Sequence, residues 1–352
     1  MNFPRILALL LILGVTALQA ATFDSANDAA RFLAGLSGPN NSGSSALRQT
    51  AAWQEHSQQV TALFDHFRAT REQPINSWRR GALPGLPGRT VFYPFGGPDY
   101  LFAHAFFPDA GTCILVGLEG ADPLPSFAGL DEKNVGAMLA NLRKSLSSDI
   151  QLSFFITKDM RVNLASTQLR GSLPLVLVFL ARCGSFISSV DLVDLSPDGA
   201  IVSRSGSGGS APGFRIQAGR KTIYYFQEDL SNSGLGSSRR LLRFVSSQGS
   251  FTTLLKSASY LMHQGEFTAI RQFILDNSAA VISDPSGIPF RSFDSSSWKV
   301  HLYGSYNGPI DMFKTYSQPD LSRAYTSGQF PVSPLPFGVG YKQTSLFVAR
   351  KK

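Results

Sequence analysis

The feature that most restricts the fold is an unbroken apolar run, TCILVGL, which begins at Thr112. Its apolar residues follow one another and do not alternate with polar ones. Strands of this kind belong to sheets that other elements cover on both faces. The run therefore predicts a buried strand, and the rest of the chain must supply a covering layer on each side of the sheet.

The residues before this strand complete a strand–helix–strand unit. RTVFYPF, from Arg89, is rich in β-forming residues, and PDYLFAHAFF, from Pro98, suits a short helix. Pro98 and Asp99 are residue types that favour the start of a helix, and Gly96 and Gly97 suit the turn before it. If the two strands are parallel, their carboxyl ends lie at one edge of the sheet.

Two carboxylates follow these strands, Asp99 after the first and Glu119 after the second. Open α/β sheets bind ligands at the edge formed by the carboxyl ends of their strands. A pair of carboxylates there suits a divalent cation or acid/base chemistry. Asp99 and Glu119 are therefore candidate catalytic residues, with His104 of the short helix as a third. The alternative is structural: Asp99 starts the helix, and His104 is packed or exposed.

Hydrophobic periodicity predicts helices around this unit and a β-rich part after it. A short helix and a loop are expected over 22 to about 42. Further expected helices cover about 45–70, 130–147, 172–184, 250–264 and 266–275, the last two forming a helix pair. The expected strands comprise a strand or short helix over 150–160, an antiparallel meander over 185–227, a hairpin over 279–293, a strand from Trp298 and a C-terminal strand.

These elements predict a mixed α/β fold, with α+β as the alternative. N-terminal helices precede a central strand–helix–strand part, and an antiparallel, β-rich C-terminal half with the helix pair follows. The expected divisions are a signal peptide over 1–20, a helical segment and linker over 21–88, an α/β part over 89–195 and a β-rich part over 196–352. The last two parts either share one core or fold separately.

The first twenty residues have the layout of a signal peptide. Arg5 precedes an apolar run from Ile6 to Leu18, and Ala20 and Ala21 supply small residues for cleavage. The run is shorter than the roughly 20 residues that span a membrane. We therefore expect a soluble exported protein, periplasmic or extracellular, with no membrane span after cleavage.

Charge and motifs narrow the function. The net charge is +8, but the basic residues are scattered, which argues against nucleic acid and leaves an anionic envelope component or a glycan as the expected partner. HExxH, CxxC and GxSxG are absent, which removes the commonest zinc and serine-hydrolase signatures. No motif identifies a cofactor, a metal site or an oligomeric state.

Two further sets of residues merit attention. In WKVHLYGSY, Lys299, His301 and Tyr303 alternate with apolar residues and share one face of a strand. Together with Arg291 from a neighbouring strand, they form a candidate site for an anionic or sugar ligand, or simply a solvated sheet face. Separately, Cys113 and Cys183 either form a disulfide, as export permits, or remain free in apolar surroundings.

Four stretches, YPFGGPDYLFAHAFFP, GLEG, FILDNSAAVISDPSGIPFR and LYGSYNGPI, together resemble a family of uncharacterised exported bacterial proteins. The resemblance spans most of the chain after the signal segment. It implies a bacterial, exported protein and carries no known activity.

The sequence thus leaves two functional hypotheses. The first is an exported envelope protein with a non-catalytic binding or accessory role and an unidentified ligand. The alternative is a metal-assisted hydrolase that uses Asp99 and Glu119. The position of these two carboxylates in the folded chain distinguishes the hypotheses.

Overall fold

The computed structural model describes most of the 352-residue chain. The described residues are 25–39, 42–86, 89–124, 127, 132–152, 169–204, 211–341 and 343–352. The expected signal peptide over 1–20 lies outside them, as does most of the strand or short helix expected over 150–160.

The described part of the chain begins with helices, as predicted. They are α1 (Ala26–Leu33), α2 (Ser45–Arg48), α3 (Ala51–Phe67), the π-helical turn η1 (Arg68–Glu72) and α4 (Gln73–Ala82). In α3 the buried residues Trp53, Val60, Phe64 and Phe67 form one apolar stripe, which is the pattern that an amphipathic helix requires.

The central part contains the strand–helix–strand unit, further helices and the meander. Its elements are β1 (Thr90–Tyr93), α5 (Tyr100–Phe106), β2 (Thr112–Gly117), α6 (Glu132–Leu152), α8 (Leu173–Arg182), β3 (Ile187–Leu195), β4 (Ile201–Ser203), β5 (Gly213–Ala218) and β6 (Lys221–Gln227). β1 and β2 are parallel, so their carboxyl ends share one edge. The antiparallel pairing of β3 with β4 and β5, and of β5 with β6, confirms the meander.

The C-terminal half is strand-rich. Its elements are α9 (Arg240–Ser247), β7 (Thr252–Leu255), η2 (Leu261–His263), η3 (Gly265–Phe267), α10 (Thr268–Asn277), β8 (Ala280–Ser283), η4 (Phe290–Ser292), β9 (Trp298–Gly304), η5 (Asp311–Tyr316), α11 (Pro319–Thr326), β10 (Val332–Ser333) and β11 (Ser345–Lys351).

All described strands belong to one mixed sheet of eleven, in the order β10-β9-β11-β8-β7-β1-β2-β6-β5-β3-β4. Its centre, from β8 to β6, is parallel. Counted along the chain, these five strands lie in the order third, second, first, fourth, fifth when read from β6 to β8. The chain therefore adds strands in one direction from β1 and then in the other.

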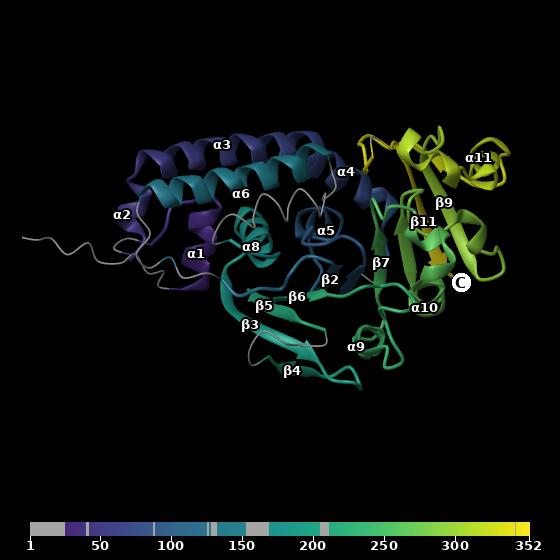
Figure 1. The fold of residues 1–352 in the computed structure, drawn as a ribbon. Helices are drawn as coiled ribbons and strands as arrows, with labels where there is room; N and C mark the ends of the chain where they lie inside the picture. Colours follow the sequence, from purple (N-terminus) through teal and green to yellow (C-terminus); the bar gives the residue numbers. More distant parts are fainter. Residues whose placement is uncertain are drawn as a thin grey trace, which may run out of the picture.

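Helices cover both faces of this sheet (Figure 1). Val91, Tyr93 and Leu115 belong to one buried cluster, which α1, α3, α5, α6 and α8 complete. Phe92 and Ile114 point to the opposite cluster, to which α9, α10 and α11 contribute. This two-sided burial confirms the mixed α/β fold and explains why β2 is an unbroken apolar run.

The helix expected over 250–264 is wrong, because the segment begins with the strand β7 and contains only the short turn η2 near its end. β7 is parallel to β1, with Val91 opposite Thr252 and Phe92 opposite Thr253, and all four of its residues are buried. A short apolar segment fits helical and strand spacing alike, and the position beside β1 selects the strand. α10 is thus the only member of the expected helix pair that forms, and α9 was not expected.

The hairpin expected over 279–293 is also wrong. β8 is parallel to β7 and antiparallel to β11. Both of its edges are therefore paired, and no edge is left for a hairpin partner. The residues after it form a turn and η4, in which Phe290 and Phe293 pack on Phe347 at 5.8 and 5.2 Å between ring centroids. In the C-terminal half, β7 and β8 are therefore parallel to each other and not antiparallel.

Candidate functional site

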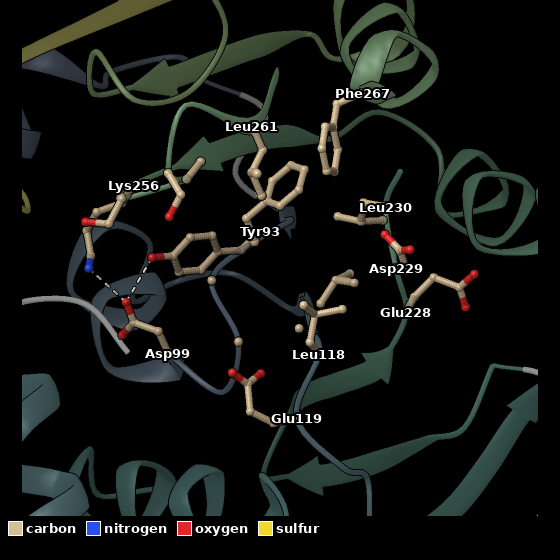
Figure 2. A pocket seen from close by; sticks show the side chains of 18 residues that line it. Tyr93, Asp99, Leu118, Glu119, Glu228, Asp229, Leu230, Lys256, Leu261 and Phe267 are labelled. Carbon is tan, nitrogen blue, oxygen red and sulfur yellow. Dashed lines mark hydrogen bonds and ion pairs between the residues drawn. The ribbon is translucent and has the colours of Figure 1, made fainter. Parts of the chain in front are cut away.

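A pocket of about 220 Å³ lies at the carboxyl edge of the parallel strands (Figure 2). Its walls come from the residues that end or follow β1, β2, β6 and β7. The strand order reverses between β1 and β7, and a reversal of this kind is where open α/β sheets bind ligands. Both Asp99 and Glu119 line this carboxyl-edge pocket, so the structure brings the two predicted carboxylates to one cavity.

Asp99 has a structural role within the pocket wall. It is 1% exposed and caps α5 by accepting the backbone N–H of Phe102 at 3.0 Å. The Tyr93 hydroxyl donates to Asp99 Oδ2 at 2.8 Å, and Lys256 Nζ lies 3.2 Å from the same oxygen. The expected helix-start role is thus combined with a buried ion pair.

Lys256 is the site residue that the sequence did not reveal. It directly follows β7, is 2% exposed and lies 4.0 Å above the centre of the Phe102 ring. The one signal was a single lysine inside the apolar segment TTLLKSASYL. The wrong helix assignment hid the signal, because on an amphipathic helix that lysine would lie on the solvent face.

Burial shapes the ionisation of the carboxyls around Lys256. It raises the pKa of Asp99, and the Lys256 ammonium, the Phe102 amide and the Tyr93 hydroxyl oppose the rise. Asp284, which follows β8, is fully buried; burial raises its pKa, and hydrogen bonds from Ser286 and Ser257 oppose the rise together with the Lys256 charge. Lys256 therefore serves two buried acids that come from different strand ends.

Glu119 lies on the pocket wall next to the glycine turns. It is 3% exposed, and the Tyr225 hydroxyl donates to its carbonyl oxygen at 2.7 Å and is 3.2 Å from its Oε2. A Cβ added at Gly117 would lie 2.3 Å from Glu119 Oε2 and 2.7 Å from Gly97 Cα. Glycine is therefore required where the turn after β1 approaches the end of β2.

The loop after β7 has a strained backbone. Ser257, Ser259 and Tyr260 all have positive φ, at 55°, 54° and 56°, a conformation that costs non-glycine residues about 1–2 kcal/mol each. Asp284 accepts the Ser257 N–H at 2.8 Å, and the Tyr341 hydroxyl donates to the Ser257 carbonyl at 2.9 Å. Strain held in place by neighbours is typical of functional sites.

Glu228 and Asp229 complete an acidic side of the pocket. Burial raises the pKa of Glu228 to about 7, Arg240 lowers it, and Asp229 and Asp194 add to the rise. Glu228 therefore exchanges a proton near neutral pH, which the sequence alone did not indicate.

His104 does not join this site. Its ring stacks on Tyr100 at 5.8 Å between centroids, and its Nδ1 lies 3.4 Å from Lys221 Nζ. Burial lowers the pKa of His104 to about 4, with the Lys221 and Arg79 charges as further causes. It packs beside Lys221 at the start of β6, so the structure places it away from the pocket that Asp99 and Glu119 line.

The second predicted constellation separates in the structure. Tyr303 is buried and packs on Trp78 at 5.0 Å between ring centroids, while His301 stacks on Tyr303 and lies 2.8 Å from the Ser333 hydroxyl. Lys299 is exposed. Arg291 belongs to η4, which replaces the expected strand, and is exposed; its neighbours Phe290 and Phe293 belong to the opposite cluster. These four residues therefore do not form one binding face.

Cys113 and Cys183 are free cysteines, so the disulfide alternative is not realised. They lie on different elements, β2 and the end of α8. Burial raises the pKa of Tyr100 well above its usual range, and both cysteines add to the rise. Burial also raises the pKa of the Cys113 thiol to about 12, which makes it an unreactive core thiol.

The described residues hold neither a metal-binding group nor a membrane span. No set of three or more His, Cys, Asp or Glu side chains among them is arranged to hold a metal ion. In the same part of the chain, no helix has both the length and the apolar character needed to cross a membrane.

Fold and pocket together define a class: an α/β protein with a two-sided parallel centre and a charged pocket where the strand order reverses. No model of a known protein family matches the chain, and no curated protein is significantly similar to it.

Proposed function

We propose that the protein is an exported binding protein whose small polar ligand occupies the carboxyl-edge pocket. The observation that carries the proposal is the convergence of four strand ends on one cavity lined by buried charges. Taking Lys256 and Asp99 out of water costs free energy. The positive-φ residues of the loop at 257–260 add a further cost in backbone strain. Neither the buried charges nor the strained loop stabilises the core, so their position around a cavity favours a role in binding.

The metal-assisted hydrolase has less support than binding. Asp99 already interacts with a cation, a hydroxyl and a backbone N–H, and Glu119 with the Tyr225 hydroxyl. A thermal-shift series with Mg²⁺, Mn²⁺ and Zn²⁺ tests the alternative. A rise in melting temperature that Asp99→Asn and Glu119→Gln both abolish would favour the hydrolase.

Binding can be tested by filling the pocket. Leu118 lines it and is 59% exposed, so Leu118→Trp adds volume at the pocket without disturbing a core. Phe186 is 65% exposed and its carbonyl accepts from Gly219, in the turn before β6 and at the opposite edge of the sheet. Phe186→Trp is therefore a matched control.

The experiment is a ligand-observed NMR screen of the full chain with amines, amino acids, polyols and nucleosides. We expect at least one class to bind the unmodified protein and the Phe186→Trp variant but not Leu118→Trp. The proposal is contradicted if no class binds, or if every bound compound binds Leu118→Trp equally well.

Export is part of the proposal and rests on the signal-peptide layout of residues 1–20. The same layout predicts cleavage after Ala20, which can be tested. After expression in a Gram-negative host, we expect the periplasmic or extracellular fraction to contain a protein that begins at Ala21. Recovery of the chain from the cytosol with Met1 intact would contradict export.

An anionic envelope component is the partner class that we expect on the surface. Its support is a groove between α9 and α10 that Arg239, Arg243 and Arg271 line. This groove is separate from the carboxyl-edge pocket, so the two can be tested independently. The test of the groove is binding of the protein to anionic vesicles, which Arg243→Gln should weaken.

A further inference from the structure

We infer that the ligand of the carboxyl-edge pocket is a nucleoside without a phosphate group, with its ribose hydroxyls on Glu119. This inference rests on the proposed binding function and names its ligand class. It is argued from the strand order, from the position of Glu119, and from the charges and aromatic side chains around the pocket.

The strand order places Glu119 where nucleotide-binding sheets hold ribose. Reading the parallel strands as third, second, first, fourth, fifth gives the order of dinucleotide-binding sheets. In those sheets, an acidic residue about 20 residues after the first turn accepts hydrogen bonds from the ribose hydroxyls. Glu119 stands at that separation from Gly97, at the end of the second strand, with its carboxylate in the pocket wall.

The first turn excludes a phosphate. Dinucleotide sites hold the pyrophosphate against a glycine-rich turn and the N–H groups of the following helix. Here the turn is Gly96-Gly97-Pro98-Asp99, and the Asp99 carboxylate occupies the helix start by accepting from Phe102. A phosphate placed there would meet the charge of Asp99 and would find that helix end already capped.

The charged residues that line the pocket also disfavour a phosphate. Asp99, Glu119, Glu228 and Asp229 line the pocket, and Lys256 is the only basic residue among its described lining residues. Lys256 is already paired with Asp99, so its charge is balanced within the wall. The pocket therefore favours a neutral or cationic ligand over an anionic one.

The opposite wall suits a base. Figure 2 shows Phe267, Leu230 and Leu261 grouped away from Glu119. Phe95 also lines the pocket, 5.9 Å from the Phe267 ring centroid and at 64° to it. Aromatic rings are the surfaces on which nucleobases stack. A ribose on Glu119 and a base against this apolar wall would place the nucleoside across the cavity.

Isothermal titration calorimetry of the full chain with four probes tests the inference: adenosine, 2′,3′-dideoxyadenosine, adenosine monophosphate and the cationic nucleoside S-adenosylmethionine. We expect adenosine or S-adenosylmethionine to bind, the monophosphate to bind at least tenfold more weakly than adenosine, and loss of the two ribose hydroxyls to weaken binding by a similar factor. Glu119→Gln should weaken adenosine at least tenfold and leave the dideoxy compound unaffected. Asp311→Asn, an exposed acid outside the pocket, should change nothing.

The outcomes separate the two proposals. Equal binding of the monophosphate and adenosine would overturn the exclusion of phosphate, and equal binding of adenosine and its dideoxy analogue would overturn the role of Glu119 even if Glu119→Gln fails to fold. If an amine or polyol binds in a Leu118→Trp-sensitive way and no nucleoside does, the inference fails and the binding function stands. If nothing binds, the binding function fails.

Discussion

Lys256 links two buried acids that come from separate strand ends, Asp99 after β1 and Asp284 after β8. Lys256→Met keeps most of the unbranched side chain and removes its charge, which leaves a carboxylate buried without its cation. Breaking a buried pair in this way costs about 3–5 kcal/mol. We expect urea denaturation to show a loss of about 3 kcal/mol in the free energy of unfolding.

Two variants control for side-chain loss at Lys256. Lys314 is exposed in η5, so Lys314→Met should leave the stability unchanged. Combining Lys256→Met with Asp99→Asn removes the uncompensated charge and should restore part of the lost stability. If Lys256→Met proves as stable as the unmodified chain, the buried pair contributes nothing to folding.

Glu228 gives the pocket a dependence on pH. Burial raises its pKa from 4.5 in the unfolded chain to about 7 in the folded one, so the folded chain holds this proton more tightly. The tighter proton binding by Glu228 stabilises the folded chain fully below about pH 4.5, and this contribution is lost as the pH rises towards 7. Glu228→Gln cannot ionise and keeps its stability over this range.

We therefore expect the melting temperatures of the unmodified chain and Glu228→Gln to agree near pH 4.5. By pH 7, the variant should melt at the higher temperature. A constant difference across this range would show that Glu228 titrates normally, and the Glu228 carboxyl resonance followed by NMR would give its pKa directly.

The close approach of two strand ends depends on Gly117. A Cβ there would overlap Glu119 Oε2 and the Gly97 backbone, so Gly117→Ala must displace the turn. Forcing volume into a packed site costs about 1–3 kcal/mol. Gly111, just before β2, has only the Arg89 carbonyl oxygen near its added Cβ, at 3.7 Å, and Gly111→Ala should change stability by less than about 0.5 kcal/mol.

Thermal denaturation and adenosine titration of the two alanine variants check this expectation. Gly117→Ala should lower the melting temperature and weaken binding together, because one displacement alters both the packing and the pocket. If Gly111→Ala is as destabilising as Gly117→Ala, the close approach of the two turns is not the cause.

Local patterns predicted the elements whose neighbours lie close in the chain. β1, α5 and β2 follow in sequence, and the apolar run of β2 alone indicated a sheet covered on both faces. The placement of Asp99 and Glu119 at one edge of the sheet followed from the same unit. β7 could not be predicted in this way, because its apolar spacing fits a helix and only the slot beside β1 makes it a strand. Lys256 was missed for the same reason.

The division of the chain into parts depends on contacts that no local pattern contains. One buried cluster includes residues from the N-terminal helices, the central unit and the last strands. Trp78 of α4 joins them, since its ring packs edge-on against Phe106 of α5 at 5.8 Å, Tyr303 of β9 at 5.0 Å and Phe337 at 5.5 Å. The helical layer and the far strands thus share a core.

Unfolding should therefore be a single transition across the molecule. Trp53 reports on α3 and Trp298 on β9, so a Trp78→Phe background with either of the other two tryptophans also replaced by Phe gives one probe at each end. We expect both probes to give the same urea midpoint. Trp78→Ala, which empties the shared position at a cost of about 3–5 kcal/mol, should lower both midpoints equally. If the two probes give different midpoints, or if Trp78→Ala lowers only one of them, the helical layer and the far strands are independent units.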